Sequence, residues 1–107
     1  MDGKLNFVKQ LRAFYQKGLG TLKPSAIALY LSVFAVANEA GNGGVLQSVR
    51  IDNERLMKMS GIGTKHTLFL HRQILCELGF IEYEKGGQFV DGLRISGKYS
   101  LIKLYKN

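Results

Sequence analysis

The sequence predicts a mainly helical α+β domain with a small antiparallel sheet toward its C-terminal end. Three observations lead to this prediction. The 107 residues fit a single domain with one core. Apolar residues recur at helical spacing through most of the first 78 positions, and the remainder combines glycines with β-branched and aromatic residues. Apolar residues make up 46% and charged residues 21%, a composition typical of chains that fold on their own.

Two helices open the chain. Apolar residues recur at helical spacing from Leu5 to Lys17, and the segment 18–20 ends this helix because its glycines suit a left-handed cap. A second helix is predicted from Pro24 to about Ala40, closed by Gly41. Apolar side chains lie nearly all round it, which favours a central core helix over a surface shared between subunits.

A strand and a short helix follow. The segment 45–51 alternates β-branched residues with others, as a short strand does. Asp52 or Asn53 can then N-cap a third helix that ends at Ser60. The segment 61–63 contains two glycines and breaks the chain.

The last elements are a helix and a hairpin. Thr64 can cap a fourth helix over 65–78, and a strand is predicted at 80–83. The segment 85–98 holds four glycines, too many for a regular helix, whereas 99–105 is rich in residues that favour strands. Two strands joined by a glycine-rich basic loop are expected.

This order of elements is that of a winged helix-turn-helix with an extra N-terminal helix. The helix-turn-helix covers about 53–78 and the wing about 80–105, within one domain over 1–107. The formal charge of +7 and the isoelectric point near 9.7 suit a polyanionic partner. We therefore expect the chain to bind double-stranded DNA.

Eight residues are the candidates for contacting DNA. The last helix has a core arc and an opposite, donor-rich arc. The core arc consists of Thr67, Leu68, Leu70, Ile74, Leu75 and Leu78. The candidates on the opposite arc are Lys65, His66, Phe69, Arg72 and Gln73, and those in the wing loop are Lys85, Arg94 and Lys98.

Every candidate except His66 has an assigned role. Arg72 suits a guanine edge or a phosphate, Gln73 an adenine, and Lys65 a phosphate near the helix start. Phe69 can touch a thymine methyl, stack on a base or pack beneath the wing, and packing is favoured. The wing cations would lie along the phosphate backbone or in the minor groove. The alternative for Arg72, Gln73 and the wing cations is an ordinary solvated surface.

The sequence gives no indication of a metal site, a cofactor or a catalytic centre. His71 falls on the core side of the last helix and is expected to be partly buried and hydrogen-bonded. One cysteine and two histidines make a poor zinc set. The segment 61–65 lacks the spacing of a phosphate-binding loop, and no nucleophile with a neighbouring base is evident. We expect a protein that is not an enzyme.

The expected compartment is the cytoplasm. The longest nearly apolar stretch, 26–37, is about twelve residues, and crossing a bilayer needs about twenty. The N-terminal residues lack the basic-then-apolar pattern of a secretion signal, and Cys76 is the only cysteine. No membrane association is therefore predicted.

Several segments resemble the N-terminal winged-helix domain of DnaD-like replication proteins and phage replisome organisers. The similarity covers roughly 22–104 and is carried by the segments 22–30, 53–56, 60–62, 67–69, 78–83 and 97–101. The resemblance implies a role in starting DNA replication on a phage, plasmid or mobile element, with origin DNA or host replication proteins as partners. It also implies self-association as a dimer or higher oligomer. Longer family members have a further C-terminal domain, so a fragment of a longer protein stays an open alternative.

Two other functions stay open at this point. A transcriptional repressor of the same fold would have the same sequence features. A protein-interaction module would use the apolar second helix and Phe69 to dimerise or dock a partner, and its basic surface would be incidental. Steep salt dependence of DNA binding would distinguish the DNA-binding functions from the interaction module.

Overall fold

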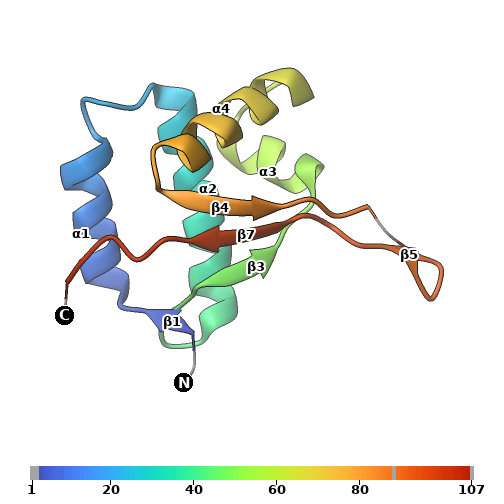
Figure 1. The fold of residues 1–107 in the computed structure, drawn as a ribbon, viewed down its shortest axis with the longest axis horizontal. Coiled ribbons are helices and arrows are strands. Elements are labelled where there is room, and N and C mark those ends of the chain that lie inside the picture. The colour runs from blue at the N-terminus through green and yellow to red at the C-terminus, as the bar shows by residue number, and fades with distance from the viewer. Residues whose placement is uncertain (1–2, 88, 107) are drawn as a thin grey trace.

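The structure, a computed structural model, describes residues 3–87 and 89–106. About half of these residues are helical and the strands pair in small antiparallel sheets, which confirms the α+β class (Figure 1). The helices in this part of the chain are α1 (Phe7–Gly18), α2 (Pro24–Gly41), α3 (Asn53–Ser60) and α4 (Lys65–Glu77).

The strands are short and form three separate antiparallel sheets in the described residues. The strands are β1 (Lys4–Leu5), β2 (Val45–Leu46), β3 (Ser48–Arg50), β4 (Ile81–Glu84), β5 (Phe89–Val90), β6 (Leu93–Arg94) and β7 (Lys98–Leu101). The main sheet has the order β3-β7-β4, so the last strand in the chain lies between the other two. Strand β1 pairs with β2, and β5 pairs with β6.

Local capping sets most helix boundaries. The side chains of Asn6, Asp52 and Thr64 accept hydrogen bonds from backbone N–H groups three residues ahead, at the starts of α1, α3 and α4. Gly61 ends α3 in the left-handed conformation. The predicted caps Asp52 and Thr64 are therefore confirmed, whereas the predicted helix start at Leu5 is wrong because Leu5 belongs to β1.

The predicted strand over 45–51 is two strands in two different sheets. Its residue Gln47 lies between β2 and β3, donates its N–H to Gly3 and accepts a hydrogen bond from the N–H of Leu101. The predicted strand over 99–105 is also shorter than expected and ends at Leu101. Backbone pairing with distant segments, which local residue preferences do not encode, decides both outcomes.

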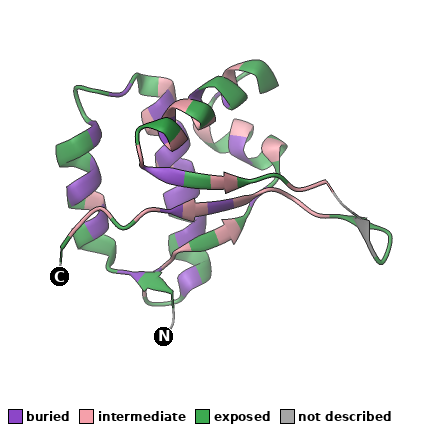
Figure 2. Ribbon diagram, viewed as in Figure 1, coloured by how far each residue is buried: buried purple, intermediate pink, exposed green. Residues whose placement is uncertain are grey.

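Helix α2 is the centre of the core, as its apolar circumference predicts. It packs against α3, α4, β2 and β3, and half of its residues are buried (Figure 2). The ring of Tyr30 stacks on Phe14 of α1 with a centroid distance of 3.9 Å, and Phe80 meets both rings edge-on. Two residues of the predicted core arc of α4 are not in the core, since Leu70 and Leu78 are 48% and 53% exposed.

A buried amide joins the two ends of the chain to α2. The fully buried Gln10 of α1 donates through Nε2 to the hydroxyl of Tyr30 and to the carbonyl of Ile102. The Oε1 of Gln10 accepts a hydrogen bond from the N–H of Leu104. Burial raises the pKa of Tyr30 to about 12, partly offset by the hydrogen bond from Gln10. The segment after β7 is thereby fixed against α1.

Between β4 and β7 the chain extends away from the body as an arm, defined here as residues 85–97 (Figure 1). The arm contains the β5–β6 hairpin, where a loop was predicted. Asp91 and Gly92 form its turn with φ angles of 53° and 78°, the left-handed values that a tight two-residue hairpin needs. Leu93, next to the turn, is 72% exposed.

Candidate nucleic-acid interface

An open groove of about 690 Å³ lies between the first turns of α4, the start of α3 and the base of the arm. Its lining residues are Asp52, Asn53, Glu54, Lys65, Phe69, Arg72, Tyr83, Lys85, Gly86, Gly87, Arg94, Ile95, Ser96 and Gly97. Five of the eight predicted DNA-contacting residues line it, namely Lys65, Phe69, Arg72, Lys85 and Arg94. The groove is therefore the candidate site.

Arg72 is held at the groove by aromatic residues. Its guanidinium carbon lies 3.8 Å from the ring centroid of Tyr83 and 4.6 Å from that of Phe69. Its Nη1 donates a hydrogen bond of 3.1 Å to the hydroxyl of Tyr99. A guanidinium carries five N–H donors, so this arrangement fixes the group and leaves other donors for a ligand.

The register of the main sheet brings these aromatic side chains together. Tyr83 of β4 is directly opposite Tyr99 of β7, and the two rings lie 4.9 Å apart. Phe69 and Arg72 are three residues apart on α4 and so share a helix face. Burial raises the pKa of Tyr99, partly offset by the hydrogen bond and charge of Arg72, which keeps the hydroxyl protonated as an acceptor for Arg72.

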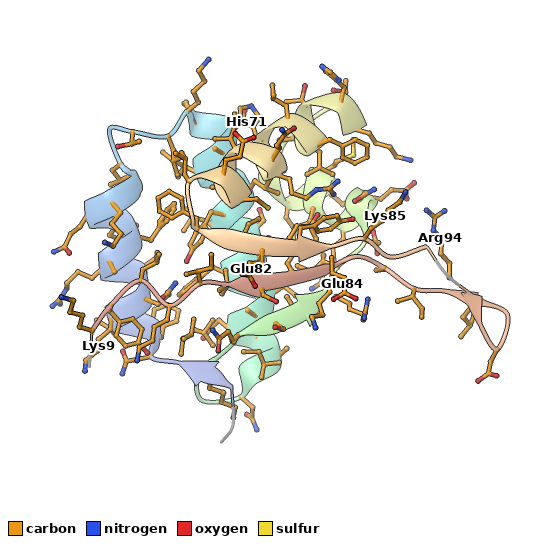
Figure 3. All side chains as sticks on the ribbon, viewed as in Figure 1. Lys9, His71, Glu82, Glu84, Lys85 and Arg94 are labelled. Atoms are coloured by element: carbon orange, nitrogen blue, oxygen red, sulfur yellow. The ribbon has the colours of Figure 1, made fainter. Side chains whose placement is uncertain are left out.

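Three exposed cations surround Arg72. Lys65 stands at the start of α4, while Lys85 and Arg94 come from the two sides of the arm (Figure 3). Within residues 3–87 and 89–106, none of the three takes part in a salt bridge. The wall formed by α3 is acidic, with Asp52 and Glu54. The groove thus has one basic side and one acidic side.

Three of the predicted DNA-contacting residues do not line the groove. His66 and Gln73 are exposed on the outer side of α4, and Nε2 of Gln73 donates to Glu77 over 3.0 Å. Lys98 precedes Tyr99, so strand alternation places it on the opposite face of the sheet. There its Nζ lies 3.8 Å from Oε1 of Glu84, which is labelled on β4 in Figure 3.

Tyr83 and Tyr99 were not predicted as site residues, because the sequence pattern indicates only that both lie in strands. A usable signal was present, because alternate residues of a strand next to the last helix must point toward that helix. Which face that is, however, depends on the register of β4 against β7.

His71 is buried as predicted, at 7% exposure, but its Nδ1 has no hydrogen-bond partner in the described part of the chain. The expected hydrogen bond is therefore not found at this nitrogen. Among the same residues, no three His, Cys, Asp or Glu side chains are grouped as a metal site would need. No helix there is long and apolar enough to span a bilayer.

Comparisons with protein-family models, with curated proteins and with solved structures find no significant match for this chain.

Proposed function

We propose that this chain is a cytoplasmic winged-helix protein that binds double-stranded DNA. In this proposal α3 and α4 form the helix-turn-helix and the arm is the wing. The three-stranded sheet β3-β7-β4 connects the helices to the wing. The proposal is supported by the order of the elements and by the arm that projects from the sheet (Figure 1), whose base lines the same groove as α4.

The observation that carries the proposal is the position of Arg72 among Lys65, Lys85 and Arg94. Four cationic side chains from α4 and both sides of the arm line one groove, and none is in a salt bridge in the described residues. A DNA backbone presents a row of phosphates that such an array neutralises. The carboxylates of Asp52 and Glu54 would repel phosphate, so the strand should run on the basic side.

The test is the salt dependence of duplex binding by fluorescence anisotropy. Each phosphate contact contributes about −0.9 to the slope of log affinity against log salt concentration. Four contacts should therefore weaken binding about 150-fold between about 50 and 200 mM salt. We expect Lys65→Ala and Arg94→Ala each to lower the slope by about 0.9.

Matched controls come from α1, which is far from the groove in sequence and carries exposed cations of the same types. Lys17→Ala and Arg12→Ala remove one charge each from exposed positions that do not line the groove. If these controls lower the slope as much as Lys65→Ala and Arg94→Ala, binding is general charge attraction and the assigned site is wrong. No duplex binding at low salt would contradict the proposal altogether.

We further propose that the protein acts in replication initiation or replisome assembly of a phage, plasmid or mobile element, with host replication proteins as partners. Only the sequence resemblance supports this part, and a transcriptional repressor is the alternative. The test is replication of a plasmid that carries the element's origin. Arg94→Ala should reduce plasmid copy number in an initiator, whereas in a repressor it should raise transcription from a target promoter and leave copy number unchanged.

A second candidate function is self-association, as a dimer or higher oligomer, and exposed apolar residues on α1 favour it. Val8 and Tyr15 lie seven residues apart on one side of the helix, and Leu19 is the residue that directly follows α1; all are about half exposed. Sedimentation of wild type and Tyr15→Glu over a range of concentrations tests this function. A monomer at every concentration in the wild type would exclude it.

A further inference from the structure

The outer face of α4 beside the groove is more apolar than a hydrogen-bonding surface for bases would be. His66, Phe69, Leu70 and Gln73 share this face at spacings of three, four and seven residues. Phe69 is 42% exposed and Leu70 is 48% exposed. Leu70, from the predicted core arc, and Phe69, from the opposite arc, are thus both exposed on one face of α4.

Few donors on this face are free to bind bases. The amide of Gln73 already donates to Glu77, which also marks the acidic end of the face. Arg72 lines the groove, where it lies against the rings of Tyr83 and Phe69 and donates to Tyr99. Base recognition by bidentate hydrogen bonds therefore has little support from these side chains.

The positive charge of the groove next to this face favours DNA as the binding partner. Phe69 lines the basic groove and also belongs to the outer face of α4, so the two surfaces are continuous. A duplex whose phosphates lie along Lys65 and the arm would bring its major groove against α4. This step rests on the proposed function of the protein.

The major groove offers one apolar group at the base edges, the 5-methyl group of thymine. We propose that Phe69 and Leu70 read thymine methyl groups in the major groove, so that the protein prefers duplexes with thymines at the positions facing α4. Arg72 then positions the phosphate backbone and contributes little to base preference. Specificity would arise from apolar contact instead of a donor–acceptor code.

Replacing thymine by deoxyuridine tests this inference, because it removes only the methyl group. We would measure anisotropy of the wild-type protein with an A·T duplex and with the same duplex carrying uracil, at about 50 mM salt. Each contacted methyl should contribute about four-fold to affinity, so two contacts give a thymine-to-uracil ratio of about sixteen.

Leu70→Ala is the informative variant, and Leu78→Ala is its matched control. Both residues are about half exposed, so neither change opens the core, and Leu78 follows the last turn of α4. The ratio should fall about four-fold in Leu70→Ala and stay at the wild-type value in Leu78→Ala.

The outcomes separate the inference from the proposed function. Salt-sensitive binding with equal affinity for both duplexes overturns the thymine contact and leaves DNA binding intact. A preference for thymine that survives in Leu70→Ala also overturns it. No binding to either duplex contradicts the proposed function itself. Concentration-dependent self-association that Leu70→Ala abolishes, without any thymine preference, would identify the face as a contact between copies.

Discussion

Removing one hydroxyl group from Tyr99 should weaken DNA binding without removing any contact to DNA. Tyr99 is fully buried, does not line the groove, and holds Arg72 through the hydrogen bond that Arg72 donates to its hydroxyl. In Tyr99→Phe the guanidinium keeps its contacts with the rings of Phe69 and Tyr83 but loses the partner that fixes its orientation. Tyr99 is thus a positioning residue for Arg72.

The expected magnitudes follow from these contacts. A hydrogen bond from a charged donor contributes about 1.5–3 kcal/mol to the free energy of unfolding. For Tyr99→Phe we expect a loss at the lower end of this range, because the guanidinium still reaches solvent in the open groove. Ordering a released side chain on binding costs about 0.5–1.5 kcal/mol. Two rings still restrain Arg72, so affinity should fall about two- to three-fold.

The assay combines thermal unfolding with anisotropy titrations over a range of salt. Tyr99→Phe should leave the salt slope at the wild-type value, because the number of phosphate contacts is unchanged. Arg72→Ala should lower the slope by about 0.9. Tyr30→Phe is the control, since it also removes a hydroxyl from a buried tyrosine but lies away from the groove.

Two results would refute this account of Arg72. If Tyr99→Phe lowers the salt slope as Arg72→Ala does, the hydroxyl itself takes part in the phosphate contact. If Tyr99→Phe and Tyr30→Phe have the same effect on affinity, the loss is a general consequence of reduced stability.

Three further predictions concern the framework around the site. Gln10→Ala should lower the free energy of unfolding by about 3 kcal/mol in chemical denaturation, because one buried and two partly buried polar groups lose their partner. Gly97→Ala should weaken DNA binding, since its Cβ would lie 2.5 Å from ring atoms of Tyr83 and displace that ring from Arg72. Stability should fall as pH rises from about 10 to about 12, by up to about 2.7 kcal/mol, because unfolded Tyr30 ionises first.

Each of these predictions has its own control. Gln16→Ala changes an exposed glutamine of the same helix and should leave stability unchanged. Gly63→Ala adds a Cβ that meets no atom within 4 Å, so an equal loss of DNA binding there would exclude the clash with Tyr83. The alkaline loss should shrink in Tyr30→Phe, and an identical pH profile in both proteins would rule out Tyr30 as its source.

The helices were predictable to within a residue or two because their ends are local. Proline at the start of α2, side-chain caps at Asp52 and Thr64, and glycine after α3 all act within one turn. The strand over 45–51 was mispredicted because its division at Gln47 depends on pairing with Gly3 and with the C-terminal segment. The residues of the segment itself do not indicate these distant pairing partners.

The groove was predicted in part for the same reason. Helical periodicity places Lys65, Phe69 and Arg72 on one side of α4, and the structure brings Lys85 and Arg94 to them. Helical periodicity placed Leu70 on the core arc, yet Leu70 is exposed. The width of the core arc depends on which elements pack against α4, and periodicity does not indicate these. Lys98 was assigned to the wing loop because the predicted strand begins at position 99, whereas pairing with Arg50 and Glu84 makes Lys98 the first residue of β7.

The central position of β7 has a consequence for synthesis of the chain on the ribosome. Strands β3 and β4 make no pairing with each other, so each waits for a strand that is translated after all the helices. Tyr99, which orients Arg72, arrives with that same strand. Nascent chains that stop short of β7 would hold α3 and α4 but lack the tyrosine that fixes the guanidinium. Competence to bind should therefore appear late and abruptly during translation, after the helices have had time to form.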